Sequence, residues 1–78
     1  MPYNVIYKLE QICKKLNDQN ITVITWLDLE RIIIQDMNVV KEKTIKRYVI
    51  ILEKLQWIKS INKKDFEITY RKKGDDIL

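Results

Sequence analysis

The stretch that decides the fold is residues 41–58, which read KEKTIKRYVIILEKLQWI. Apolar side chains recur at helical spacing through Ile45, Val49 and Leu52. This spacing predicts an amphipathic helix over about residues 41–56, with these three side chains turned toward a core. The rest of a small domain must then be built on either side of this helix.

Three elements are predicted before it. Apolar residues at helical spacing indicate a first helix from about Val5 to Leu16, with Asn4 as its cap. A β-branched run at 21–24 suits a short strand. Thr25, followed three residues later by an acidic side chain, is typical of a helix start, and a second helix is predicted over about residues 26–35.

After the long helix the pattern changes to that of strands. Residues 57–61 and the alternating run 66–70 predict two strands, joined by a polar turn at 62–65. The predicted fold is mainly α with a small β-hairpin (α+β), in the order helix, strand, helix, helix, strand, strand. We expect a single domain over residues 1–78, with 71–78 as a flexible tail.

Composition narrows the possible functions. The chain has 78 residues, one cysteine and no histidine, which leaves almost nothing to build a zinc site or a histidine-based catalytic centre. Cys13 lies on an apolar stripe and is expected to pack as a small hydrophobic residue. There is no secretory signal and no apolar run near eighteen residues. We therefore expect a cytoplasmic protein that is not an enzyme, with no membrane span, metal, cofactor or small-molecule ligand.

Charge is distributed unevenly along the chain. Residues 1–40 hold four basic and five acidic side chains, a net charge of −1, whereas residues 41–73 hold eleven basic and four acidic, a net charge of +7. Asp75 and Asp76 bring the total to +4. This asymmetry favours a polyanion-binding half on a near-neutral scaffold half. The alternative is a lysine-rich surface that only faces solvent.

Within the long helix the charges separate by angle. One side mixes signs, and Glu42 and Lys46 form a favourable i,i+4 pair there. The opposite side has no carboxylate and carries Lys43, Arg47, Ile50 and Lys54. Arginine can bond to guanine or phosphate and lysine to phosphate, so this side suits the major groove of DNA. Ile50 is suited equally to a thymine methyl group and to a protein contact.

Several positions of this region follow a known pattern: a threonine, an arginine three residues on, two leucines and an apolar pair, here Thr44, Arg47, Leu52, Leu55 and Ile58. With these residues, the segment from about 24 to 70 resembles winged helix-turn-helix DNA-binding proteins, above all small archaeal and bacterial transcriptional regulators. Asn38 and Gln56 stand where that family usually has glycine. Asn38 tolerates a left-handed conformation, whereas Gln56 would adopt it at a cost of about 1 kcal/mol.

The resemblance implies a small transcriptional regulator that binds double-stranded DNA, with the third helix in the major groove and the hairpin beside it. A homodimer is plausible because one short module reads few base pairs. The predicted DNA-binding residues are Lys43, Thr44, Lys46, Arg47, Ile50, Lys54, Lys63 and Lys64. The alternative is a protein-interaction module, an adaptor subunit that would use Ile50, Leu27 and Ile34 as contacts.

Overall fold

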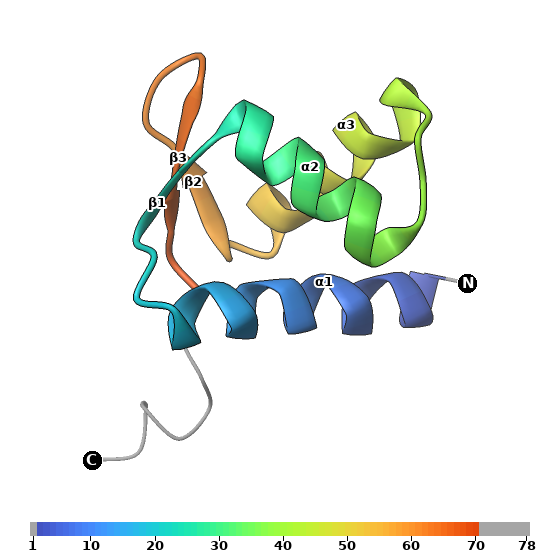
Figure 1. Ribbon diagram of the computed structural model, residues 1–78, viewed down its shortest axis with the longest axis horizontal. Coiled ribbons are helices and arrows are strands. Elements are labelled where there is room, and N and C mark those ends of the chain that lie inside the picture. The colour runs from blue at the N-terminus through green and yellow to red at the C-terminus, as the bar shows by residue number, and fades with distance from the viewer. Residues whose placement is uncertain (1, 71–78) are drawn as a thin grey trace.

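The computed structural model describes residues 2–70, and their side chains from Val5 onward. These residues form an α+β fold (Figure 1), and its elements follow one another in the predicted order. The helices and strands are α1 (Pro2–Asp18), β1 (Val23–Thr25), α2 (Trp26–Met37), α3 (Glu42–Lys54), β2 (Ile58–Ser60) and β3 (Asp65–Ile68). The tail predicted at 71–78, with its basic side chains, lies outside the described residues.

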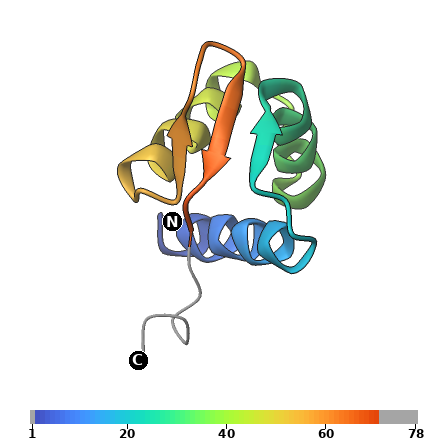
Figure 2. The same ribbon diagram turned by 90° about the vertical axis from the view of Figure 1, so that its left-hand side faces the viewer.

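The three strands of this region form one antiparallel sheet in the order β1-β3-β2. The hairpin of β2 and β3 was predicted, and the structure sets its register by placing Ile58 opposite Ile68. The partner of β1 was not: β1 pairs with β3, and Ile24 lies opposite Phe66. Figure 2 shows the two edge strands of the sheet separated in this way, β2 beside α3 and β1 beside α2.

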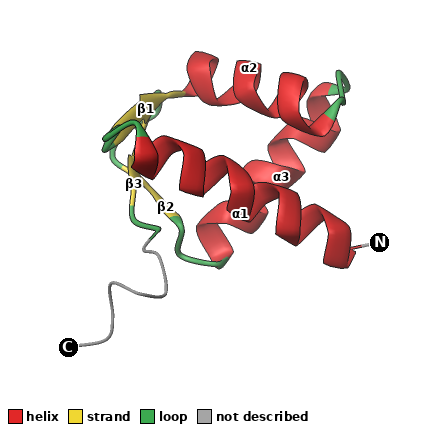
Figure 3. Ribbon diagram, turned by 60° about the horizontal axis from the view of Figure 1, so that its bottom comes forward, coloured by secondary structure: helices red, strands yellow, loops and turns green. Residues whose placement is uncertain are grey.

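The core lies between the three helices and the inner face of the sheet. Each helix contributes a fully buried leucine, namely Leu9, Leu29 and Leu52, and β3 contributes Phe66. In Figure 3 the strands gather at one end of the three helices, so the sheet closes that end of the core. The predicted inner line of α3 is confirmed because Ile45, Val49 and Leu52 are all buried. Cys13 is buried as well, as expected.

The ends of the helices differ from the prediction. Asn4 does not cap α1, because the helix already begins at Pro2, a residue whose fixed φ and missing N–H suit a first helical position. The second helix runs on to Met37, whose side chain is buried in the core and holds the last turn in place. The third helix is shorter than expected and ends at Lys54.

The strands are also shorter than predicted, since β1 covers Val23–Thr25 and β2 covers Ile58–Ser60. Leu27 and Ile34, the two apolar residues of α2 that lie away from its buried line, have different environments. Ile34 is half-buried and packs against the core, so only part of its side chain is open to the contact that the adaptor alternative requires. Leu27 stays on the surface with 66% of its area exposed.

Each helix is followed by a non-glycine residue with positive φ: Asn20 at 59°, Asn38 at 56° and Gln56 at 62°. Asparagine is the residue that most readily takes this conformation after glycine, because its side chain is short and polar. After α1, the N–H of Ile21 donates to the carbonyl of Leu16 and that of Asn20 to Asn17, which satisfies the last helical carbonyls. These residues set the directions in which the chain leaves each helix.

Candidate nucleic-acid interface

The outer side of α3 is the main candidate surface. Its axis from Lys43 to Lys54 covers eleven residue steps of about 1.5 Å, or about 16 Å. The side chains opposite the buried line are all exposed in the structure, as predicted. We call this set the basic stripe, and it consists of Lys43, Arg47, Ile50 and Lys54.

Ion pairs do not neutralise the basic stripe. Within residues 5–70 the side-chain ion pairs are Lys46 with Glu42, at 3.9 Å, and Lys15 with Asp36, at 2.8 Å. The first is the predicted i,i+4 pair, and both of its partners are well exposed, so it contributes at most a few tenths of a kcal/mol. The cations of the stripe take part in neither pair. Their charge is therefore available to a partner.

The other predicted contacts of α3 are placed less favourably than the stripe. Thr44 is half-buried, toward the inner side of the first turn. Lys46 is exposed, but it already has Glu42 as a neighbour. Of the six predicted residues on α3, the stripe forms one group and these two lie on either side of it.

The turn between β2 and β3 holds the two remaining predicted contacts, Lys63 and Lys64, and both are exposed. Its shape depends on Asn62. The Asn62 Oδ1 accepts the backbone N–H of Lys64 (2.8 Å) and of Asp65 (3.0 Å). The Asn62 Nδ2 donates to Asp65 Oδ2 at 3.0 Å, and Ser60 Oγ donates to the Asn62 carbonyl at 3.0 Å. This Asx-type turn presents the two lysines in a defined conformation.

The turn and the start of α3 lie on the same side of the molecule. In Figures 1 and 2 both are on the side away from α1. Only a few residues connect the end of α3 to β2, so this junction fixes the direction of the β2–β3 hairpin relative to α3. The two segments, far apart in the sequence, thus share the side of the fold away from α1, although they lie toward opposite ends of it in Figure 1.

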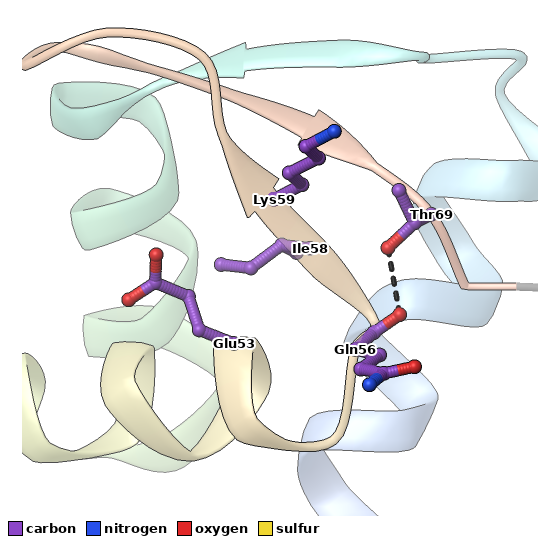
Figure 4. A pocket seen from close by; sticks show the side chains of 5 residues that line it. All are labelled: Glu53, Gln56, Ile58, Lys59 and Thr69. Atoms are coloured by element: carbon purple, nitrogen blue, oxygen red, sulfur yellow. Dashed lines mark hydrogen bonds between the residues drawn. The ribbon is translucent and has the colours of Figure 1, made fainter.

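Gln56 forms that junction and adopts the left-handed conformation that its position requires. Its N–H donates to the Glu53 carbonyl (2.9 Å), and the Trp57 N–H donates to the Leu52 carbonyl (3.0 Å), which ends α3 in a Schellman motif. The Thr69 hydroxyl donates to the Gln56 carbonyl at 2.7 Å (Figure 4). The absence of glycine therefore makes this helix end less favourable in free energy, but the helix still ends in the same geometry.

A shallow hollow of about 420 Å³ lies at this junction, lined by Glu53, Gln56, Ile58, Lys59 and Thr69 (Figure 4). Its polar groups include the Glu53 carboxylate, close to the last turn of α3. That negative charge limits the basic surface at the C-terminal end of the helix. The basic surface is accordingly strongest toward the start of α3.

The scaffold beneath the interface is joined by polar contacts that were not predicted from the sequence. Lys15 pairs with Asp36 and so ties α1 to the end of α2. The Tyr70 hydroxyl donates to Glu10 Oε2 at 2.9 Å, and Asn17 Nδ2 donates to the Tyr70 carbonyl at 3.1 Å. These partners are 21 to 60 residues apart, so no local pattern could reveal them.

Burial also affects two titratable groups of this scaffold. It raises the pKa of the Tyr70 hydroxyl to about 12, and the hydrogen bond to Glu10 acts in the same direction. Burial, with the nearby Glu10 charge, raises the pKa of the Cys13 thiol to about 12. The thiol is consequently protonated near neutral pH and is a poor nucleophile. Both tryptophans pack against other aromatic rings, Trp57 edge-on to Tyr70 and Trp26 tilted against Phe66.

Comparisons of the chain with models of protein families, with curated proteins and with solved structures found no match. Among residues 2–70 no helix is both long and apolar enough to cross a membrane. The same part of the chain contains no group of three or more Cys, Asp or Glu side chains arranged to hold a metal ion. The features that bear on function are therefore those of the surface formed by the basic stripe and the β2–β3 turn.

Proposed function

We propose that this protein binds double-stranded DNA as a winged helix-turn-helix domain, with α3 in the major groove and the β2–β3 turn against the flanking backbone. The observation that carries the proposal is the basic stripe, whose three cations have no acidic partner among the described residues. The element order and the left-handed turn at Asn38 between α2 and α3 support it. A small transcriptional regulator is the role that suits such a domain.

The spacing of charge supports DNA over solvent as the partner of the stripe. Lys43 and Arg47 lie one helical turn apart, and like charges at this spacing destabilise an isolated helix by a few tenths of a kcal/mol. Phosphates remove that repulsion and release counterions. The major groove, about 12 Å wide, accepts a helix, and the stripe of about 16 Å can follow it over several base pairs.

A homodimer is part of the proposal. A single α3 of this length contacts few base pairs, and two copies would place their helices in successive major grooves about 34 Å apart. Sedimentation of the free protein and of its complex with a selected duplex would show whether one or two copies bind. One copy in both states would remove the dimer and leave DNA binding intact.

The test of DNA binding is the double variant Lys43→Ala/Arg47→Ala. We expect it to weaken binding to a random duplex by at least about tenfold in a gel-shift titration, because alanine replaces neither the charge nor the hydrogen bonds offered to DNA. The matched control is Lys8→Ala/Arg31→Ala, which removes the same charge from exposed positions on α1 and α2. Equal affinities of the two double variants would overturn the assignment of α3.

Salt dependence gives a second, independent measurement. The slope of log K against log salt changes by about 0.9 for each phosphate that the protein no longer neutralises. If Lys43 and Arg47 both contact phosphates, their removal should make the slope shallower by about 1.8. A duplex affinity that does not depend on salt would contradict an electrostatic contact of any kind.

The protein-interaction alternative has one observation in its favour. Leu27 is largely exposed and lines an apolar hollow together with Trp26 and Lys64. Ile34, however, packs against the core and offers a partner less exposed surface than Leu27 does. Failure to bind any duplex at low salt would favour this alternative, and Leu27→Asp would then be expected to abolish partner binding.

A further inference from the structure

Ile50 is an apolar residue at the centre of a cationic surface. Arg47 lies three residues before it and Lys54 four residues after it, so the three side chains follow one another along one side of α3. Ile50 is 51% exposed. It belongs neither to the buried core nor to the half-buried side chains packed against that core. The packing of the core therefore does not require an apolar residue at this position, whose immediate neighbours along the stripe are cations.

We infer that Ile50 contacts the methyl group of a thymine and makes α3 selective for thymine at that position. The inference rests on the proposed binding of duplex DNA by α3. It specifies which base the centre of the helix reads. The cations around Ile50 can bind phosphates whatever the base sequence. Ile50 has no charge or hydrogen-bonding group to offer a phosphate, so its partner must be an apolar group on a base.

The chemistry of the major groove leads to this choice. Base edges there present hydrogen-bond donors and acceptors, and thymine alone adds a methyl group. An isoleucine forms no hydrogen bonds, so over any other base edge it would displace water from polar groups without replacing their hydrogen bonds. Over thymine, the two apolar groups bury each other. Against thymine, Ile50 therefore breaks the fewest hydrogen bonds to water and buries the most apolar surface.

The neighbouring arginine places the thymine more closely. Ile50 and Arg47 are three residues apart, a rise of about 4.5 Å along the helix. Base pairs are stacked about 3.4 Å apart. A guanine bound by Arg47 and a thymine bound by Ile50 should then lie one or two base steps from each other.

The experiment removes the methyl group and nothing else. Two duplexes of about 20 base pairs alternate dG with dT, or dG with deoxyuridine, on one strand, opposite alternating dC and dA. Fluorescence anisotropy at fixed salt gives the affinity of the protein for each. We expect the protein to bind the thymine duplex about fourfold more tightly, the equivalent of about 0.8 kcal/mol for one buried methyl group.

Variants then assign the effect to Ile50. Ile50→Ala should bind both duplexes equally, and Ile50→Val should keep most of the fourfold preference because it keeps a branched side chain. The matched control is Val23→Ala on β1, an aliphatic residue with the same exposed fraction, 51%, at the opposite edge of the sheet from β2. It should keep the whole preference.

The possible failures can be told apart. If the unmodified protein binds both duplexes equally, in a salt-dependent way, the thymine contact is wrong and the proposed function stands. A preference that survives in Ile50→Ala would also overturn the inference, because another residue would then read the methyl group. Absence of salt-dependent binding to either duplex would overturn the proposed function together with the inference.

Discussion

Two consecutive helices of nearly equal length, α2 and α3, are alike on their buried sides and differ on their exposed sides. Both bury one side: Leu29, Ile33 and Met37 in α2, and Ile45, Val49 and Leu52 in α3. Their exposed sides differ in sign. The second helix has three acidic residues and one basic, a net charge of −2, and the third has four basic and two acidic, a net charge of +2.

The two helices also differ in what holds them. At the start of α2 the Thr25 side chain accepts the Asp28 N–H at 3.2 Å, and at its end Asp36 pairs with Lys15 of α1. At the start of α3, Lys41 makes no side-chain cap. A side-chain cap and an ion pair to another helix thus stabilise α2, whereas the cations of the basic stripe on α3 take part in no ion pair among the described residues. The inner sides pack the core, and the different charges of the outer sides are the basis on which we propose α3 as the helix that binds DNA.

The largest expected effect concerns the inner sides, where the two helices are alike. Leu29→Ala and Leu52→Ala should each lower the free energy of unfolding by about 2–5 kcal/mol, because both side chains are fully buried. Ile50→Ala, on the outer side of α3, should change it by less than about 0.5 kcal/mol. Urea unfolding measures all three. A cost below about 1 kcal/mol for Leu52→Ala would mean that α3 is not packed as α2 is.

The next test loosens the scaffold under both helices by raising the pH. Folding raises the pKa of Cys13 from 9.0 and of Tyr70 from 10.0, each to about 12, so the folded state holds both protons more tightly than the unfolded state. The stability that these two protonated groups contribute is fully present below pH 9. It should be lost as the pH rises from about 9 to 12. Tyr70→Phe should flatten the upper part of this decline in thermal unfolding. An unchanged profile would contradict the role of the Tyr70 hydroxyl.

A smaller effect should separate the two helix starts. Thr25→Ala removes the cap of α2 and should cost about 1 kcal/mol. Lys41→Ser would supply the cap that α3 lacks and should stabilise the protein by up to about 1 kcal/mol. Urea unfolding of both variants gives the difference. Equal signs for the two changes would show that the starts are not capped differently.

Effects of about this size or smaller should appear at the helix ends. Gln56→Gly should stabilise the protein by about 1 kcal/mol because glycine takes positive φ without strain. Asn38→Gly should gain less, since asparagine already tolerates this conformation. Thermal unfolding can resolve the two if compared side by side. A larger gain at Asn38 would mean that asparagine, not glutamine, is the more strained residue.

Much of the fold was readable from local patterns. The element order, the Thr25 cap and the inner line of α3 depend on side chains a few residues apart, whereas the left-handed residue at Asn38 was expected from the resemblance to winged helix-turn-helix proteins. The ends of the helices were harder to predict from the sequence. The length of α2, for example, depends on the burial of Met37 in a core formed by distant segments. The basic stripe was predictable since exposure on a helix follows directly from its periodicity.

By itself, the sequence determined which residues form helices and strands and which side of α3 is basic, because these properties arise from neighbours within one or two turns. Only the tertiary structure decided that β1 pairs with β3, that Ile34 packs against the core while Leu27 stays exposed, and that the Tyr70 hydroxyl donates to Glu10. Such contacts join residues that are distant along the chain, and many pairings satisfy the same local pattern. Only packing in three dimensions selects one of them.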